Sequence, residues 1–228
     1  MKKIVMLNVS PKGKKASSYK FLDELKAKIE ENQIECKLES FSYVSLFKNE
    51  EKSNQLFTAI TESDVLILAF PLYVDSLSAV TQDFLERYNQ FMSERQKKVQ
   101  ELYTIINCGF PESEHNTIAF EIIQNFAKQT GLNCRYNLSI GMGPMAGQTP
   151  FKSGTMKHIE RHFDAIVEQL KDPASSADFN SKIEYSAPTF GFLNIFKKNL
   201  YIIFGSFGWK QEAKKNKVKH LLYAKPYK

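Results

Sequence analysis

The stretch SPKGKKASS, residues 10 to 18, combines hydroxyl, ammonium and flexible backbone groups directly after a short apolar run. Ser17 and Ser18 stand where a helix is expected to begin, and the free N–H groups of a helix N-terminus attract anions. Ser10 adds a hydroxyl donor, Lys12 a positive charge, and Gly13 the freedom for a loop to wrap a phosphate. A solvated basic loop with a serine cap is the alternative that these residues leave open. The G-K-[ST] ending of a Walker A loop is absent, which argues against an ATPase or GTPase.

Two further segments carry aromatic residues directly after apolar runs. In FPLYVDSLS, Pro71, Leu72 and Tyr73 follow the most hydrophobic run of the chain and offer a flat apolar surface with free backbone amides. Such a surface suits a planar heteroaromatic ring, although plain capping of the core is the alternative. In NCGFPE, Gly109 permits close backbone approach and Phe110 supplies a second aromatic wall.

The elements that must position these segments follow from hydrophobic periodicity. Short runs rich in Val, Ile and Leu alternate with segments of helical period, as in parallel strands joined by crossover helices. The expected strands are Lys3 to Val9, Glu35 to Ser40, Asp64 to Phe70, Leu102 to Cys108 and Asn133 to Gly141. The expected helices are Tyr19 to Ile29, Ser53 to Glu62, Ala79 to Arg95, Asn116 to Thr130, ended by Gly131, and Gly154 to Leu170. Ligands of such open sheets bind at the carboxyl ends of the strands, where the three segments above would lie.

The C-terminal quarter of the chain differs from the rest in charge. Residues 171–228 hold 11 lysines and 4 carboxylates, whereas the upstream residues hold 20 basic and 21 acidic residues, so the net charge of +6 belongs to the tail. The polar stretch DPASSAD predicts a main domain of residues 1–171 and an extension of residues 172–228. Within the extension, apolar residues recur at helical spacing from Phe190 to Trp209. This pattern leaves open a helix packed on the domain or a dimer partner, a lid, and a basic segment on a membrane surface.

Cysteine usage and hydropathy bear on the cellular setting. The three cysteines are widely spaced, which predicts neither a disulfide framework nor a zinc site and fits a reducing cytoplasm. No apolar run approaches the roughly 20 residues of a membrane span, and the N-terminus lacks a signal-peptide core, so we expect a soluble, cytoplasmic protein.

His158 and His162 lie four residues apart, but Ile159 stands where the H-E-x-x-H motif has its glutamate, so no metal site is predicted.

The three segments resemble the phosphate loop, the isoalloxazine loop and the fourth-strand loop of the flavodoxin-fold NAD(P)H-dependent FMN reductases, in the branch of small flavin and quinone-type oxidoreductases. The resemblance covers roughly residues 1–170. It implies an α/β, flavodoxin-like three-layer sandwich with a five-stranded parallel sheet in the order 2-1-3-4-5, followed by a helical, basic and aromatic C-terminal extension. The residues that it assigns to FMN are Ser10, Lys12, Ser17 and Ser18 at the phosphate and Pro71, Leu72, Tyr73, Val74, Gly109 and Phe110 around the ring.

The resemblance also implies an activity. A hydride would pass from NAD(P)H to FMN and the electrons on to a small acceptor such as a quinone or free flavin, in a homodimer and with no nucleic acid partner. Because the cofactor carries the chemistry, no catalytic side chain is named. Two alternatives stay open: an electron carrier without nicotinamide turnover, and a scaffold that has lost the cofactor. Val9, which stands where the family usually has glycine, motivates the second.

Overall fold

The computed structural model describes residues 1–95, 98–172, 182–189, 206–207, 210–211 and 213–224. The chain forms two compact units, Met1–Thr189 and Phe190–Lys228, and the first contains the sheet and helices α1 to α6. The first unit thus extends past Lys171. The described residues of the second unit include a 3-10 turn at Lys219–Leu221, and most of the helix predicted from Phe190 to Trp209 lies outside the described residues. Within the ranges above, no helix has both the length and the apolar character needed to cross a membrane.

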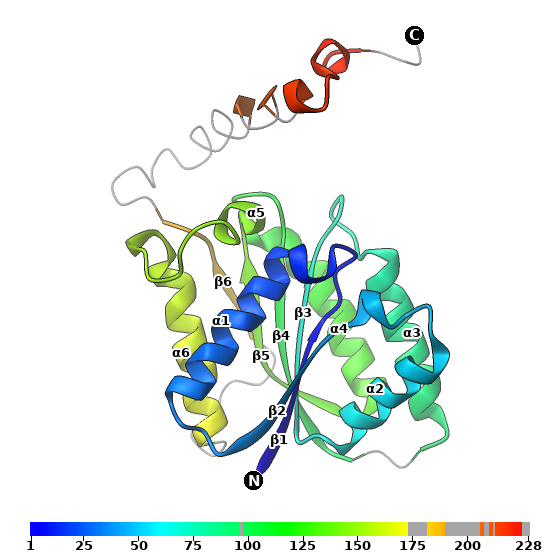
Figure 1. Ribbon diagram of the computed structural model, residues 1–228. Helices are drawn as coiled ribbons and strands as arrows, with labels where there is room; N and C mark the ends of the chain where they lie inside the picture. Colours follow the sequence, from blue (N-terminus) through cyan, green and yellow to red (C-terminus); the bar gives the residue numbers. More distant parts are fainter. Residues whose placement is uncertain (96–97, 173–181, 190–205, 208–209, 212, 225–228) are drawn as a thin grey trace. The chain divides into compact units, whose positions relative to one another are not determined.

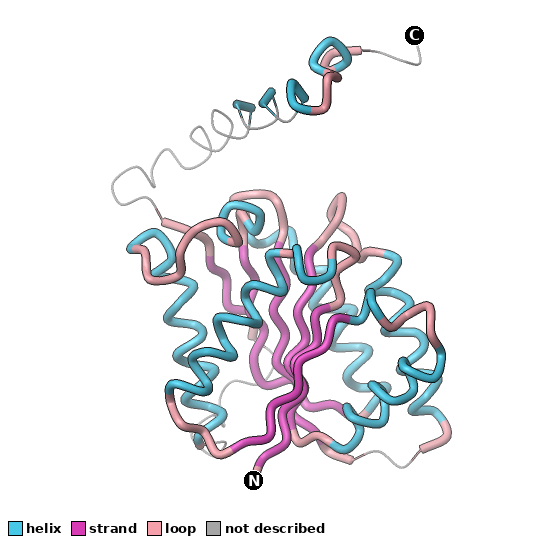
Figure 2. Tube along the Cα trace, viewed as in Figure 1, coloured by secondary structure: helices cyan, strands magenta, loops and turns pink. Residues whose placement is uncertain are grey.

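Parallel strands form a single sheet in the order β2-β1-β3-β4-β5-β6 (Figures 1 and 2). The strands are β1 (Lys2–Asn8), β2 (Cys36–Ser42), β3 (Val65–Pro71), β4 (Gln100–Asn107), β5 (Leu132–Ile140) and β6 (Ile183–Ser186). The first five confirm the predicted order 2-1-3-4-5. The predicted count of five was wrong, because β6 pairs with β5 from Asn137↔Ile183 to Ile140↔Ser186. The sequence IEYS of β6 contains a single aliphatic residue, so no apolar run marks it.

Helices cover both faces of this sheet, as the sequence predicts. They are α1 (Ser17–Glu31), α2 (Glu50–Glu62), α3 (Ala79–Ser93), α4 (Thr117–Thr130), α5 (Gly143–Ala146) and α6 (Lys157–Lys171). Figure 1 shows α1 and α6 on one face and α2, α3 and α4 on the other. Side chains of β1 alternate between them: Val5 and Leu7 join the hydrophobic cluster under α2 to α4, whereas Ile4 and Met6 join the cluster under α1 and α6.

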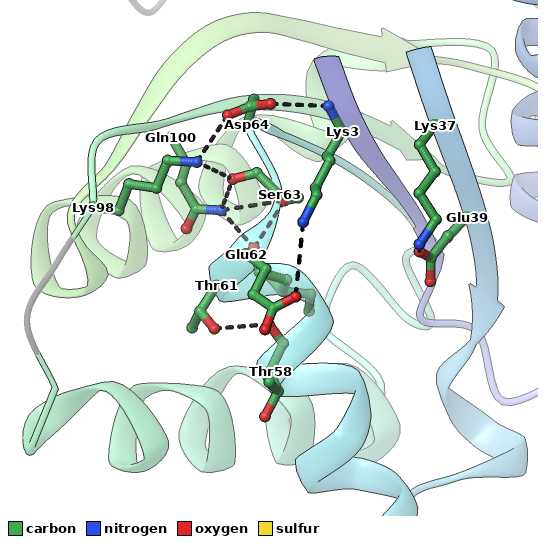
Figure 3. A network of polar contacts seen from close by, with 11 residues as sticks. Lys3, Lys37, Glu39, Thr58, Thr61, Glu62, Ser63, Asp64, Lys98 and Gln100 are labelled. Carbon is green, nitrogen blue, oxygen red and sulfur yellow. Dashed lines mark hydrogen bonds and ion pairs between the residues drawn. The ribbon is translucent and has the colours of Figure 1, made fainter. Parts of the chain in front are cut away.

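Polar contacts fix the register of the strands at their amino ends (Figure 3). The carboxylate of Asp64, just before β3, accepts the Lys3 N–H of β1 at 2.9 Å and lies 2.8 Å from the Lys98 ammonium. These two interactions hold the pKa of Asp64 below its usual value. Beside them, the Gln100 amide donates to the Ser63 carbonyl at 2.7 Å. The starts of β1, β3 and β4 are therefore tied together, which sets where the same strands end at the opposite edge.

Candidate functional site

Strands β1, β3 and β4 end nearly level with one another. Asn8 of β1 pairs with Ala69 of β3, and Pro71 of β3 pairs with Asn107 of β4. Because neighbouring strands lie about 5 Å apart, the loops that follow leave the sheet side by side, at the upper edge in Figure 1. The strand order reverses between β1 and β3, and such switch points are where open parallel sheets bind ligands. The three segments that the sequence singles out thus meet at one edge.

The loop after β1 folds back on itself. The Ser10 carbonyl accepts the Gly13 N–H at 3.0 Å, and the Ser10 hydroxyl accepts the Lys12 N–H at 3.3 Å. Gly13 has a φ of +55°, a conformation that favours glycine. Ser10 is buried, whereas Lys12, Lys14 and Lys15 are exposed and take part in none of the ion pairs formed by the described residues. The loop therefore presents three uncompensated positive charges.

Helix α1 starts directly after this loop without a side-chain cap. Its N-cap residue is Ala16, whose methyl group cannot accept a hydrogen bond, so the N–H groups of the first turn stay open to an external acceptor. The half-buried Ser17 lies close to Gly147, where a Cβ would come within 2.4 Å of the Ser17 hydroxyl oxygen. The buried Ser18 donates its hydroxyl hydrogen to Asn8 Oδ1 at 2.7 Å, which leaves its backbone N–H for an anion.

Val9 directly precedes the loop after β1, and its side chain points into the core. Its side chain is fully buried and belongs to the same hydrophobic cluster as Val5 and Leu7, on the face covered by α2, α3 and α4. Its carbonyl accepts the Thr81 hydroxyl of α3 at 2.9 Å. Val9 therefore packs in the core, on the face of the sheet opposite to α1.

The loop after β3 is anchored to β4 and ends in a tight turn. The Leu72 N–H donates to the Asn107 carbonyl at 2.8 Å, and Pro71 is half-buried at the end of β3. Tyr73 and Ser76 exchange two backbone hydrogen bonds, 3.0 and 3.1 Å long, across the turn. Leu72 and the half-buried Tyr73 therefore lie at the base of the turn, next to the end of β4.

Val74 and Asp75 form the tip of this turn in a left-handed conformation. Their φ angles are 52° and 54°, which glycine or asparagine would adopt with less strain than a β-branched residue. The Val74 side chain is 98% exposed. The strained tip thus holds an apolar side chain in solvent beside the edge of the sheet, and backbone strain of this kind clusters at functional sites.

The loop after β4 combines open space with an aromatic wall. A Cβ at Gly109 would meet no heavy atom of the described residues within 4 Å, and the Phe110 ring is 44% exposed. The imidazole of His115 stacks on Phe110 with 4.6 Å between ring centroids, and its Nδ1 lies 3.4 Å from Asp75 Oδ1. His115 was not among the predicted site residues, because nothing in its sequence neighbourhood shows that Asp75 lies next to it.

The loop after β5 closes against both neighbours. The Met142 N–H donates to the Phe110 carbonyl at 2.6 Å. Gly141 packs tightly on Pro111, since a Cβ at Gly141 would lie 2.4 Å from the Pro111 carbonyl oxygen. At its other end, the Lys20 ammonium of α1 donates to the Thr149 carbonyl at 3.1 Å. This loop, which contains the short helix α5, therefore links the aromatic wall to the start of α1.

Cys108 is a buried thiol at the end of β4. Burial, the largest influence, raises the pKa of its thiol to about 11. Its sulfur lies 3.6 Å from the Phe110 carbonyl and 3.5 Å from the Glu112 carbonyl. Cys108 is therefore protonated at neutral pH and helps to shape the loop after β4.

Comparisons with known proteins bear on the fold. Neither the family models nor the curated proteins gave a match to this sequence. Among solved structures, an NADH:FMN oxidoreductase in its apo form is similar with a TM-score of 0.55 and 14% identity, over 80% of this chain and 95% of that chain. An oxidoreductase from Corynebacterium diphtheriae has a TM-score of 0.56 and 9% identity, over 75% and 95% of the two chains. The general stress protein 14 of Treponema denticola, in complex with FMN, has a TM-score of 0.54 and 12% identity, over 75% and 99%. The chain therefore has the flavodoxin-like fold of these structures, as its sequence predicts.

Proposed function

We propose that this chain binds FMN at the carboxyl edge of its sheet and works as an NAD(P)H-dependent oxidoreductase. The observation that carries the proposal is that two features lie at one switch point of the sheet. One is an uncapped helix start that follows three lysines without an ion-pair partner among the described residues, and the other is the partly exposed aromatic ring of Phe110. An anion site next to an apolar planar surface matches the two chemically different halves of a flavin mononucleotide.

The residues present fit this cofactor. Lys12 and the first-turn N–H groups of Ser17 and Ser18 would hold the phosphate, with Ser10 supporting the loop from beneath. Around the ring, the assignment comprises Pro71, Leu72, Tyr73, Val74, Gly109 and Phe110. The space at Gly109 supports it, because a flat ring needs such an opening beside Phe110. The buried position of Val9 removes the main objection drawn from the sequence, that a side chain there crowds the loop.

The chemistry of the proposal belongs to the cofactor. Bound FMN supplies hydride and electron transfer between a nicotinamide and a second acceptor. The protein would orient the ring between the loops after β3 and β4 and exclude water from one of its faces. The FMN complex and the NADH:FMN oxidoreductase among the similar folds support this reading. The acceptor is proposed to be a small molecule such as a quinone or free flavin, and the active form a homodimer.

The experiment that tests the proposal is the visible absorption spectrum of the purified protein, followed by denaturation and identification of the released chromophore. We expect an oxidised-flavin spectrum and FMN in the supernatant, or tight rebinding of FMN by colourless protein. Colourless protein that binds no added FMN would refute the proposal and favour a scaffold. Steady-state oxidation of NADH and NADPH with an artificial acceptor separates the enzyme from the electron carrier, since a carrier shows no turnover.

A further inference from the structure

Asn8, the last residue of β1, is a buried polar hub beneath the phosphate loop. Its side chain is fully shielded from solvent and makes three hydrogen bonds to three separate segments. Its Nδ2 donates to the Gly13 carbonyl at 3.0 Å and to the Ser42 hydroxyl at 3.4 Å, and its Oδ1 accepts the Ser18 hydroxyl at 2.7 Å. One amide thus joins the end of β1 to the loop, to the end of β2 and to the first turn of α1.

The bond to Gly13 helps to set the direction of the loop backbone, because Gly13 also begins a 3-10 turn, Gly13–Lys15, in which its carbonyl accepts a backbone N–H. Because the peptide between Gly13 and Lys14 is trans, its carbonyl and its N–H point in opposite directions. The Gly13 carbonyl accepts both the Asn8 amide at 3.0 Å and the Ala16 N–H at 3.1 Å, so the Lys14 N–H of the same peptide points away from Asn8, and none of the described residues accepts it. A side chain at Gly13 would disturb this arrangement, since a Cβ there would lie 3.0 Å from Val44 Cγ1.

The bond from Ser18 sets the position of the helix start. Ser18 lies in the first turn of α1, and its hydroxyl reaches down to the same amide that holds the Gly13 carbonyl. Asn8 therefore contacts both the loop and the first turn of the helix, and together with the backbone bond from Ala16 to the Gly13 carbonyl it positions their N–H groups relative to each other. Hydrogen bonds to an anion depend steeply on direction, so this relative position decides how well a phosphate is held.

We infer that Asn8 is the positioning residue for phosphate recognition, a role that rests on the proposed FMN site. Its loss should weaken binding of FMN much more than binding of riboflavin, which has the same ring and lacks the phosphate. Asn8→Asp is the sharper variant. It keeps an acceptor for Ser18 but sets a carboxylate oxygen against the Gly13 carbonyl and adds negative charge beneath the phosphate.

Isothermal titration of flavin-free protein with FMN and with riboflavin tests the inference, with thermal unfolding measured alongside. Asn116→Ala is the matched control, because Asn116 is equally buried and donates to the Ile106 carbonyl and the Ser139 hydroxyl. We expect Asn8→Ala and Asn8→Asp to lower the ratio of FMN affinity to riboflavin affinity at least ten-fold, and Asn116→Ala to leave that ratio unchanged. Ser18→Ala should lower the ratio several-fold. If the Asn8 variants do not fold, this milder variant tests the positioning role of Asn8.

The outcomes separate this inference from the proposed function. Wild-type protein that binds FMN, with an unchanged ratio in the Asn8 and Ser18 variants, would overturn the positioning role alone. An equal fall in the ratio of FMN affinity to riboflavin affinity in Asn116→Ala would also overturn the positioning role, because the effect would then be one of general stability. Wild-type protein that binds neither flavin would overturn the proposed function, and the positioning role with it.

Discussion

The imidazole of His115 lies against the ring of Phe110, with 4.6 Å between the ring centroids and 26° between the ring planes. The same imidazole reaches Asp75 at the tip of the neighbouring loop, 3.4 Å from Nδ1 to Oδ1. The loop after β3 and the loop after β4 are thereby joined at their outer ends, in addition to the backbone bond between Leu72 and Asn107 at their bases. This joint holds the exposed aromatic wall of the candidate site in one orientation.

Replacing His115 should loosen that wall. We expect His115→Ala to lower the free energy of unfolding by no more than about 1 kcal/mol, since the pair is partly exposed. Dissociation of FMN should become several-fold faster, because Phe110 loses its stacking partner and Asp75 its contact. Stopped-flow release of FMN measures this rate. The control is His158→Ala, an exposed histidine on α6, and equal rates in both variants would contradict the role of His115.

A methyl group at Gly109 should interfere with the cofactor and leave the protein otherwise intact. A Cβ there meets no described heavy atom within 4 Å, so Gly109→Ala should change the free energy of unfolding by about 0.5 kcal/mol or less. We expect the Kd for FMN to rise roughly ten-fold, because the methyl group takes space that the ring needs. Gly154→Ala is a matched control, since a Cβ there is equally unobstructed. Unchanged FMN affinity in both variants would place the ring elsewhere.

Cys108 should react slowly with alkylating reagents. With a pKa of about 11, roughly one thiol in a thousand is ionised at pH 8, and only the thiolate attacks iodoacetamide. Mass spectrometry of alkylated protein should show Cys108 modified in urea and spared in the native state, where its side chain is also buried away from the reagent. Cys108→Ala should retain flavin binding. A folded Cys108→Ala variant that does not bind flavin would show that the thiol contributes to the site.

Asp64 should stabilise the fold in a pH-dependent manner. Its pKa is lowered in the folded chain, so its contribution is complete above the unfolded value of about 3.9 and is lost as the pH falls through the folded pKa. We expect Asp64→Asn to lower the free energy of unfolding at pH 7 by about 1 kcal/mol or less, with FMN affinity unchanged. Urea unfolding should show the difference from wild type shrinking in acid. Asp23→Asn, at an exposed position of α1, is the matched control for the removal of one carboxylate.

Much of the fold could be predicted because it follows from local hydrophobic patterns. The run Val65 to Phe70 is short and is followed by Pro71, which favours a strand buried on both faces, and the stripe of Leu22, Leu25 and Ile29 on α1 repeats at helical spacing. Gly131 ends α4 with a φ of 80°, as expected of a C-terminal glycine. These features depend on neighbours in sequence, so they are visible without a structure.

The features that the sequence did not reveal depend on tertiary contacts or break a local preference. The left-handed turn at Val74 and Asp75 could not be predicted, because the sequence there lacks the usual Asn-Gly signal and valine rarely adopts that conformation. Asn8 reads as a polar residue that ends an apolar run, and its three partners become apparent only when β2 and α1 pack around it. The sequence therefore predicts which loops form the candidate site, while Asn8 and His115, which help to shape those loops, were not predicted.

Strand β6 has a practical consequence for any shortened form of the protein. It covers β5 from Asn137 to Ile140, and the Gly141 N–H just beyond donates to the Ser186 carbonyl at 2.8 Å. A chain cut at Lys171 would leave those backbone groups as a bare sheet edge, ready to pair with another copy. Such a chain should aggregate, whereas one that continues through Thr189 keeps its edge covered by a short strand in which charged Glu184 discourages further growth of the sheet.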